Sequence, residues 1–95
     1  MYEVSTSLYN HVADKLIAAI GTKEYFSGHI GTNYDNVECE LRCTLFIARE
    51  LEPADGGNFR PITALIPVWW EFHTYINDSE VLNDFSFGEL CDVAL

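Results

Sequence analysis

The chain has 95 residues, of which 48% are hydrophobic and 14% aromatic, and its formal net charge at pH 7 is −10. The length favours one domain over residues 1–95, and this much apolar sequence excludes the low hydrophobicity typical of disordered proteins. The negative charge disfavours direct binding to nucleic acids and to anionic membrane surfaces, because their phosphate groups would be repelled.

The N-terminal sequence and the cysteines indicate a cytoplasmic protein. The first residues lack the basic and apolar regions of a secretory signal peptide, and the longest apolar run, residues 64–70, is too short to span a membrane. The three cysteines include no Cys-x-x-Cys pair. On an extended strand Cys39 and Cys43 would lie about 13 Å apart, too far for a disulfide. We therefore expect buried thiols in a reducing compartment.

The first predicted element is a helix over residues 7–20. The apolar residues of its expected buried face recur every four positions: Leu8, Val12, Leu16 and Ile20. Thr6 or Ser7 is the expected N-terminal cap, since a hydroxyl there can accept a hydrogen bond from a free backbone N–H. Gly21 follows the last periodic residue, where a left-handed conformation commonly ends a helix.

Three strands are predicted next, over residues 25–30, 36–51 and 61–76. In the two long strands apolar residues alternate with polar ones, at odd positions from Val37 to Ile47 and at even positions from Ile62 to Ile76. Turn-forming residues occupy 31–36, 52–58 and 77–79. We therefore expect a long antiparallel hairpin, 36–51 with 61–76, that buries one face.

Charge pairing predicts the register of this hairpin. Placing Arg42 opposite Glu71 puts Glu40 opposite His73, and both are favourable cross-strand neighbours on the outer face. A shift of two residues would instead bring Glu40 against Glu71, two like charges. On the inner face the same register pairs Leu45 with Val68, Cys43 with Trp70, Leu41 with Phe72, and Val37 with Ile76.

Pro67 predicts that the second long strand is an edge of the sheet, because proline has no amide hydrogen to donate to a neighbour. The expected strand order is 1-2-3, with the helices on the face that carries Leu41 and Trp70. The outer face would then expose an apolar patch near the hairpin loop: Phe46, Ala48, Leu65, Pro67 and Trp69. Such a patch with an aromatic anchor is typical of a protein interface. The alternative is that the C-terminal segment covers it.

The last fifteen residues allow two interpretations. Ser86 and Glu89 have the spacing of a capping box, and Phe85 and Leu90 that of a hydrophobic staple, which together predict a short terminal helix. The alternative is an edge strand over residues 81–87. We favour the helix, and the expected fold is α+β with the element order α-β-β-β-α.

No motif predicts catalysis, a metal or a cofactor. His73 beside Glu40 could form an acid–base pair, but an open sheet face without a nearby nucleophile favours a surface charge pair. The histidines and cysteines lack the spacing of zinc ligands. The acidic turn around Ser79 lacks the pattern of an EF-hand loop.

We therefore expect a small acidic interaction or accessory module without catalytic activity. It would bind a protein partner, or a second copy of itself in a homodimer, through the apolar patch. The alternative is a DNA-mimic inhibitor, whose carboxylates would occupy the nucleic-acid-binding groove of another protein. A small enzyme is the third and least favoured hypothesis.

Overall fold

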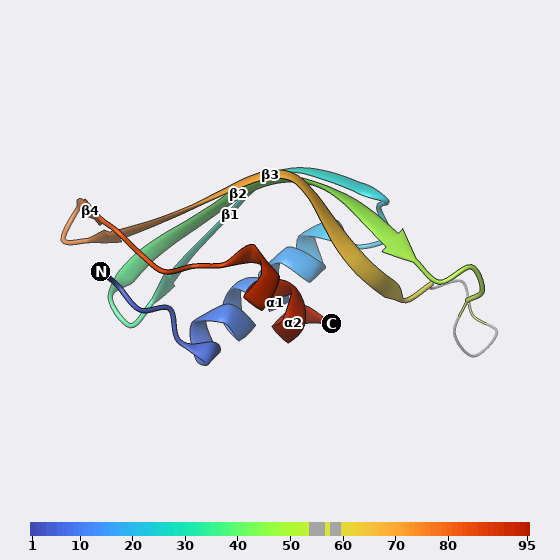
Figure 1. Ribbon diagram of the computed structural model, residues 1–95, viewed down its shortest axis with the longest axis horizontal. Coiled ribbons are helices and arrows are strands. Elements are labelled where there is room, and N and C mark those ends of the chain that lie inside the picture. Colours follow the sequence, from blue (N-terminus) through green and yellow to red (C-terminus); the bar gives the residue numbers. More distant parts are fainter. Residues whose placement is uncertain (54–56, 58–59) are drawn as a thin grey trace.

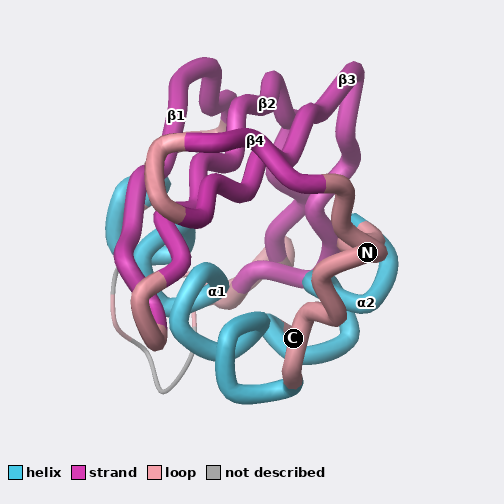
Figure 2. Tube along the Cα trace, turned by 90° about the vertical axis from the view of Figure 1, so that its left-hand side faces the viewer, coloured by secondary structure: helices cyan, strands magenta, loops and turns pink. Residues whose placement is uncertain are grey.

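The computed structural model describes residues 1–53, 57 and 60–95, and these form an α+β fold. The elements in chain order are α1 (Thr6–Ile20), β1 (Tyr25–Tyr34), β2 (Val37–Arg49), β3 (Ile62–Ile76), β4 (Ser79–Val81) and α2 (Phe87–Ala94). The strands form one antiparallel sheet in the order β1-β2-β3-β4, and both helices pack on the same face of it (Figures 1 and 2). The predicted class and strand order are confirmed, but the short fourth strand was not expected.

Helix α1 begins one residue before the predicted start, because Ser5 is its cap. The hydroxyl of Ser5 accepts a hydrogen bond from the backbone N–H of Leu8 at 3.1 Å, so the prediction of Thr6 or Ser7 as the cap is wrong. The helix ends at Gly21, whose φ of 56° is easily adopted by glycine. The N–H of Gly21 donates to the carbonyl of Ile17.

Helix α2 confirms the predicted terminal helix, and a phenol completes its cap. The Ser86 hydroxyl accepts from the N–H of Glu89 at 3.5 Å. The N–H of Ser86 donates to the hydroxyl of Tyr9 at 2.9 Å, so Tyr9 provides the acceptor that the Glu89 side chain would provide in a capping box. This bond fastens the start of α2 to α1.

Two tight turns connect the strands on the side of the sheet far from the hairpin loop. Asp35 and Asn36 both have positive φ, 51° and 66°, as a type I′ hairpin turn requires. Residues 31–34 were predicted as part of this turn but extend β1, because two residues suffice to reverse the chain. Asn77 and Asp78 repeat the geometry between β3 and β4, with φ of 51° and 65°.

The predicted hairpin register is confirmed over half of its length. Arg42 lies opposite Glu71, Glu40 opposite His73, Leu41 opposite Phe72 and Cys43 opposite Trp70. The β2–β3 ladder ends at Glu38 with Tyr75, so the predicted pair of Val37 with Ile76, the next position in the same register, is not formed.

A β-bulge at Val68 changes the register in the other half of the hairpin. Thr44 pairs with Trp69, but Leu45 pairs with Pro67, so the predicted pair of Leu45 with Val68 is wrong. An extra residue on one strand reverses the alternation beyond it. Leu65 is therefore 6% exposed and lies in the core, while Ile66, predicted to face inward, is 50% exposed. A second shift, between Ala48 and Arg49, restores the original alternation at the end of the hairpin.

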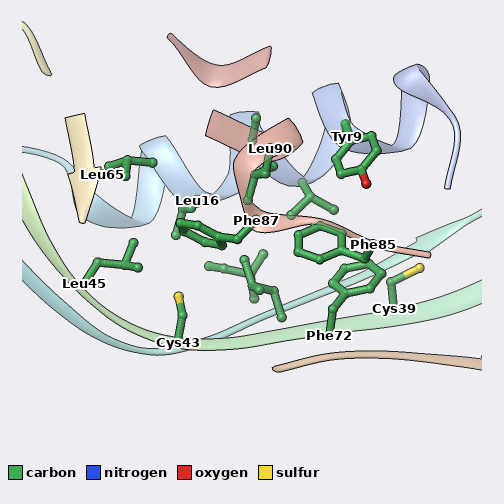
Figure 3. Close-up of a cluster of buried hydrophobic side chains, with 14 of the residues drawn as sticks. Tyr9, Leu16, Cys39, Cys43, Leu45, Leu65, Phe72, Phe85, Phe87 and Leu90 are labelled. Atoms are coloured by element: carbon green, nitrogen blue, oxygen red, sulfur yellow. The ribbon is translucent and has the colours of Figure 1, made fainter. Parts of the chain in front are cut away.

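The core lies between the inner face of the sheet and the two helices. Figure 3 shows Phe72 of β3 against Phe85, and their rings stack with centroids 4.0 Å apart. Trp70, at the margin of this core, contacts the rings of Phe85 and Phe87. Burial raises the pKa of the Cys43 thiol to about 11, so this thiol stays protonated and acts as an apolar group.

Pro67 lies on an exposed edge, as predicted. Strand β4 pairs only with Thr74–Ile76 of β3. Within the described structure, the part of β3 near Pro67 therefore has β2 along one edge and no strand along the other. The hairpin loop predicted over residues 52–58 lies partly outside the described residues, which omit 54–56 and 58–59. Neither helix in the described part of the chain has the length and apolar character needed to cross a bilayer.

Candidate protein interface

The outer face of the sheet, turned away from both helices, carries the candidate site (Figure 1). Because strands β1, β2 and β3 are in register, the outward side chains form rows across them. From the hairpin loop to the tight turns the rows are Ala48/Ala64, Tyr25/Phe46/Ile66, Ser27/Thr44/Trp69, His29/Arg42/Glu71, Gly31/Glu40/His73 and Asn33/Glu38/Tyr75. The first three rows form an apolar half of the face and the last three a polar half.

The apolar half is a continuous set of large side chains that remain about half exposed. The exposed fractions are 51% for Tyr25, 52% for Phe46, 50% for Ile66 and 46% for Trp69. The rings of Tyr25 and Phe46 contact each other, with centroids 5.4 Å apart and planes inclined by 59°. Three strands of a rigid sheet thus present four large apolar groups to solvent.

Two hydroxyl groups adjoin this patch. Ser27 and Thr44 lie side by side in the same row as Trp69, and their hydroxyl oxygens are 2.9 Å apart, within hydrogen-bonding distance. One hydrogen bond between them uses one of the two hydroxyl hydrogens, so the other remains available to water or to a partner beside the indole.

The five residues predicted for the interface have different positions. Phe46 and Trp69 lie in the apolar half, Ala48 is half-buried beside them, and Pro67 is exposed next to the bulge. Leu65 was predicted wrongly, since the bulge turns it into the core (Figure 3). The C-terminal segment does not cover the patch, because α2 packs on the opposite face.

Sequence reasoning missed Tyr25 and Ile66. Tyr25 is the first residue of β1 and pairs directly with Phe46, a position that the sequence predicts once the β1–β2 register is drawn. Ile66 was assigned to the core because the even-numbered pattern was continued through Pro67. A proline within a strand is itself a signal for a bulge, and a bulge there would have moved Ile66 outward.

Ion pairs in the polar half differ from the cross-strand pairs expected. Arg42 contacts Glu40 on its own strand, with Nε 2.7 Å from Oε1. The imidazole of His73 lies between two carboxylates, with Nδ1 2.8 Å from Glu80 and Nε2 3.1 Å from Glu71. Both ring nitrogens are therefore occupied by carboxylates, as expected of a charge pair rather than of a general base.

These contacts shift the protonation of both acidic and basic groups. The hydrogen bond from Arg42 lowers the pKa of the Glu40 carboxyl. The hydrogen bonds to Glu80 and Glu71 raise the pKa of His73, because both favour the imidazolium form. Glu40 is therefore held in its ionised form, and His73 is held toward its charged state.

Two open, shallow depressions mark the outer face. One, of about 330 Å³, is lined by Glu38, Glu40, Arg42, Tyr75 and Asp78. The other, of about 250 Å³, is lined by Ser27, Gly28, His29, Arg42 and Trp69, and it joins the two halves of the face. Within the described part of the chain, no three His, Cys, Asp or Glu side chains are grouped to hold a metal ion.

Comparison of the chain with known protein families, with curated proteins and with solved structures finds no match.

Proposed function

We propose that the protein is a non-catalytic interaction module that binds another protein through the outer face of its sheet. The observation that carries this proposal is the row of Tyr25, Phe46 and Ile66 with Trp69 beside it, each about half exposed. Contiguous apolar patches of this kind on a folded domain commonly mark binding surfaces. Tyrosine and tryptophan also supply much of the energy at protein interfaces.

The position of the patch supports the proposal. It lies on β1, β2 and β3, of which β2 is hydrogen-bonded on both sides, so the backbone under Phe46 is held by its neighbours. The backbone of such a scaffold loses little further freedom on binding. Aromatic side chains, which have two torsions, add contact area at a low entropic cost.

The other hypotheses have less support. A DNA mimic requires carboxylates along an extended stripe, whereas those of the outer face occupy its polar half, where Glu40, Glu71 and Glu80 contact Arg42 or His73. An enzyme requires a cleft that excludes water, and both depressions on this face are open. We place the protein in the cytoplasm, since its cysteines are free thiols.

The test is purification of the tagged full chain from its native source, together with any protein bound to it. Trp69→Ser removes an anchor of the apolar half, and Leu82→Ser is the matched control, because Leu82 is 78% exposed but lies outside the six rows. We expect a specific partner to remain with wild type and Leu82→Ser and to be lost with Trp69→Ser, while circular dichroism shows all three folded. The proposal is wrong if Trp69→Ser retains the same partner.

A further inference from the structure

We infer that the partner of the outer face is a positively charged protein surface and not a second copy of this chain. This inference rests on the proposed function, and it adds the chemistry of the partner. It follows from two properties of the face, the limited area of its apolar half and the charge of the surface next to it.

The apolar half alone is too small for a stable complex. A phenylalanine, tyrosine or tryptophan can bury about 150–250 Å², and the three here are about half exposed already on the folded protein. With Ile66 they offer roughly 300–450 Å², whereas a standard interface buries about 800 Å² on each partner. A stable partner must therefore cover more of the face than this patch.

The additional area is provided mainly by the polar half. Toward the hairpin loop, one row of alanines, Ala48 with Ala64, separates the patch from the end of the paired strands. In the other direction three more rows follow, and the depression lined by Trp69 and Arg42 joins them to the patch. A partner that seats an apolar group on Phe46 and covers enough area thus extends over the carboxylates.

These carboxylates outnumber the cations around them. The polar half and the adjoining β3–β4 turn carry five carboxylates beside one arginine and two histidines: Glu38, Glu40, Glu71, Asp78 and Glu80 beside Arg42, His29 and His73. Glu38 and Asp78 line the 330 Å³ depression, and neither makes an ion pair with another described residue. Arg42 lines the same depression but forms its ion pair with Glu40, so a lysine or arginine of a partner could pair with Glu38 and Asp78 there.

A second copy of the chain cannot supply that charge. The protein has five Lys and Arg residues against fifteen Asp and Glu, and of the described basic residues only Arg42 lies in the rows of the outer face. Two copies packed through their polar halves would bring carboxylates against carboxylates, which opposes association. The negative electrostatic potential of these carboxylates attracts a cationic partner and accelerates its encounter with the outer face.

The test uses short random peptides displayed as a library and selected for binding to the full-length protein. We expect the enriched peptides to combine lysine or arginine with an aromatic residue. A representative synthetic peptide, followed by fluorescence anisotropy, should bind at least about tenfold more weakly to Phe46→Ser. It should also bind several-fold more weakly to Glu38→Gln/Asp78→Asn, and progressively more weakly as salt rises from about 0.05 M to about 0.5 M.

The control variant is Asp14→Asn/Asp92→Asn, which removes the same number of charges from exposed positions on α1 and α2. It should leave peptide binding unchanged. Peptides that lack positive charge yet lose binding with Phe46→Ser would overturn the charge inference and leave the proposed function standing. Peptides insensitive to Phe46→Ser would count against both.

Analytical ultracentrifugation tests separately whether the chain associates with a second copy of itself. We expect wild type to sediment as a monomer throughout the micromolar range. A dimer that dissociates with Phe46→Ser and persists with Leu82→Ser would contradict the inference, since the face would then be occupied by its own copy.

Discussion

The two faces of the sheet are built from the same strands but have different surroundings. Along β2 the inward residues Leu41, Cys43 and Leu45 are fully buried under the helices, while Phe46, between the inward positions 45 and 47, is half exposed. Burial of the inner face provides the main stabilisation of the fold. The apolar residues of the outer face gain much less from folding, so their presence calls for a different explanation, which we propose is binding.

The largest expected effect comes from opening a cavity on the inner face. Leu41→Ala removes a fully buried side chain at the centre of β2 and should lower the free energy of unfolding by about 2–5 kcal/mol. Phe46→Ala, which removes a larger side chain from the outer face of the same strand, should cost about 1 kcal/mol or less. Urea denaturation measures both. Equal losses would show that the two faces contribute alike to stability.

Leu65 and Ile66, which are adjacent in β3 but lie on opposite faces of the sheet, give a sharper comparison. Leu65→Thr places a hydroxyl in the core and should cost about 2–4 kcal/mol, whereas Ile66→Thr, on the exposed face, should change the free energy of unfolding by about 0.5 kcal/mol or less. Threonine suits a strand at both positions, so backbone propensity cancels. If Ile66→Thr were the more damaging change, the bulge at Val68 would be misplaced.

Two arginines of β2 extend the comparison to polar groups. Arg49 donates to the carbonyls of Arg60, Gly21 and Lys23 and so ties β2 to the end of α1 and to the start of β3. Arg49→Met should cost about 2 kcal/mol. Arg42→Met loses one ion pair on the exposed face and should have almost no effect on thermal unfolding, because solvent screens such pairs.

The smallest effect concerns pH and the outer face. His73 has a raised pKa in the folded state because of its hydrogen bonds to Glu80 and Glu71. Its contribution to the free energy of unfolding is therefore fully present below about pH 6.5, the ordinary pKa of histidine. It is lost as pH rises through the raised pKa. The stability of wild type relative to His73→Gln should therefore fall as the pH rises above about 6.5. Parallel pH profiles for the two proteins would exclude this linkage.

The sequence predicted the fold where local signals agreed with one another. The structure confirms the period of α1, the Ser86 cap of α2 and the register that sets Arg42 opposite Glu71. The partners differ in detail, because Arg42 forms its ion pair with Glu40 and Tyr9 replaces Glu89 in the cap. The turn at Asp35 was predicted at the correct position but over too many residues. Turn-forming residues occupy all of 31–36, whereas the turn itself needs only Asp35 and Asn36.

The candidate site was predicted in part, and the error on β3 has one origin. A single extra residue at Val68 exchanges Leu65 and Ile66 between the faces, and a binary pattern cannot show such an insertion because both residues are apolar. The β4 strand was missed because three residues carry no periodicity. Its position also depends on a contact far along the chain, in which the N–H of Tyr2 donates to the carbonyl of Leu82, the residue after β4.

Site-specific photo-crosslinking can capture the positively charged protein that we propose binds the outer face. A photoreactive residue is placed at Ile66 in the apolar half or at Leu82 as an exposed control, in the full chain expressed in its native source. We predict a discrete covalent adduct from position 66 with a basic protein, and none from position 82. The same adducts from both positions, or an adduct of the chain with itself from position 66, would contradict the claim.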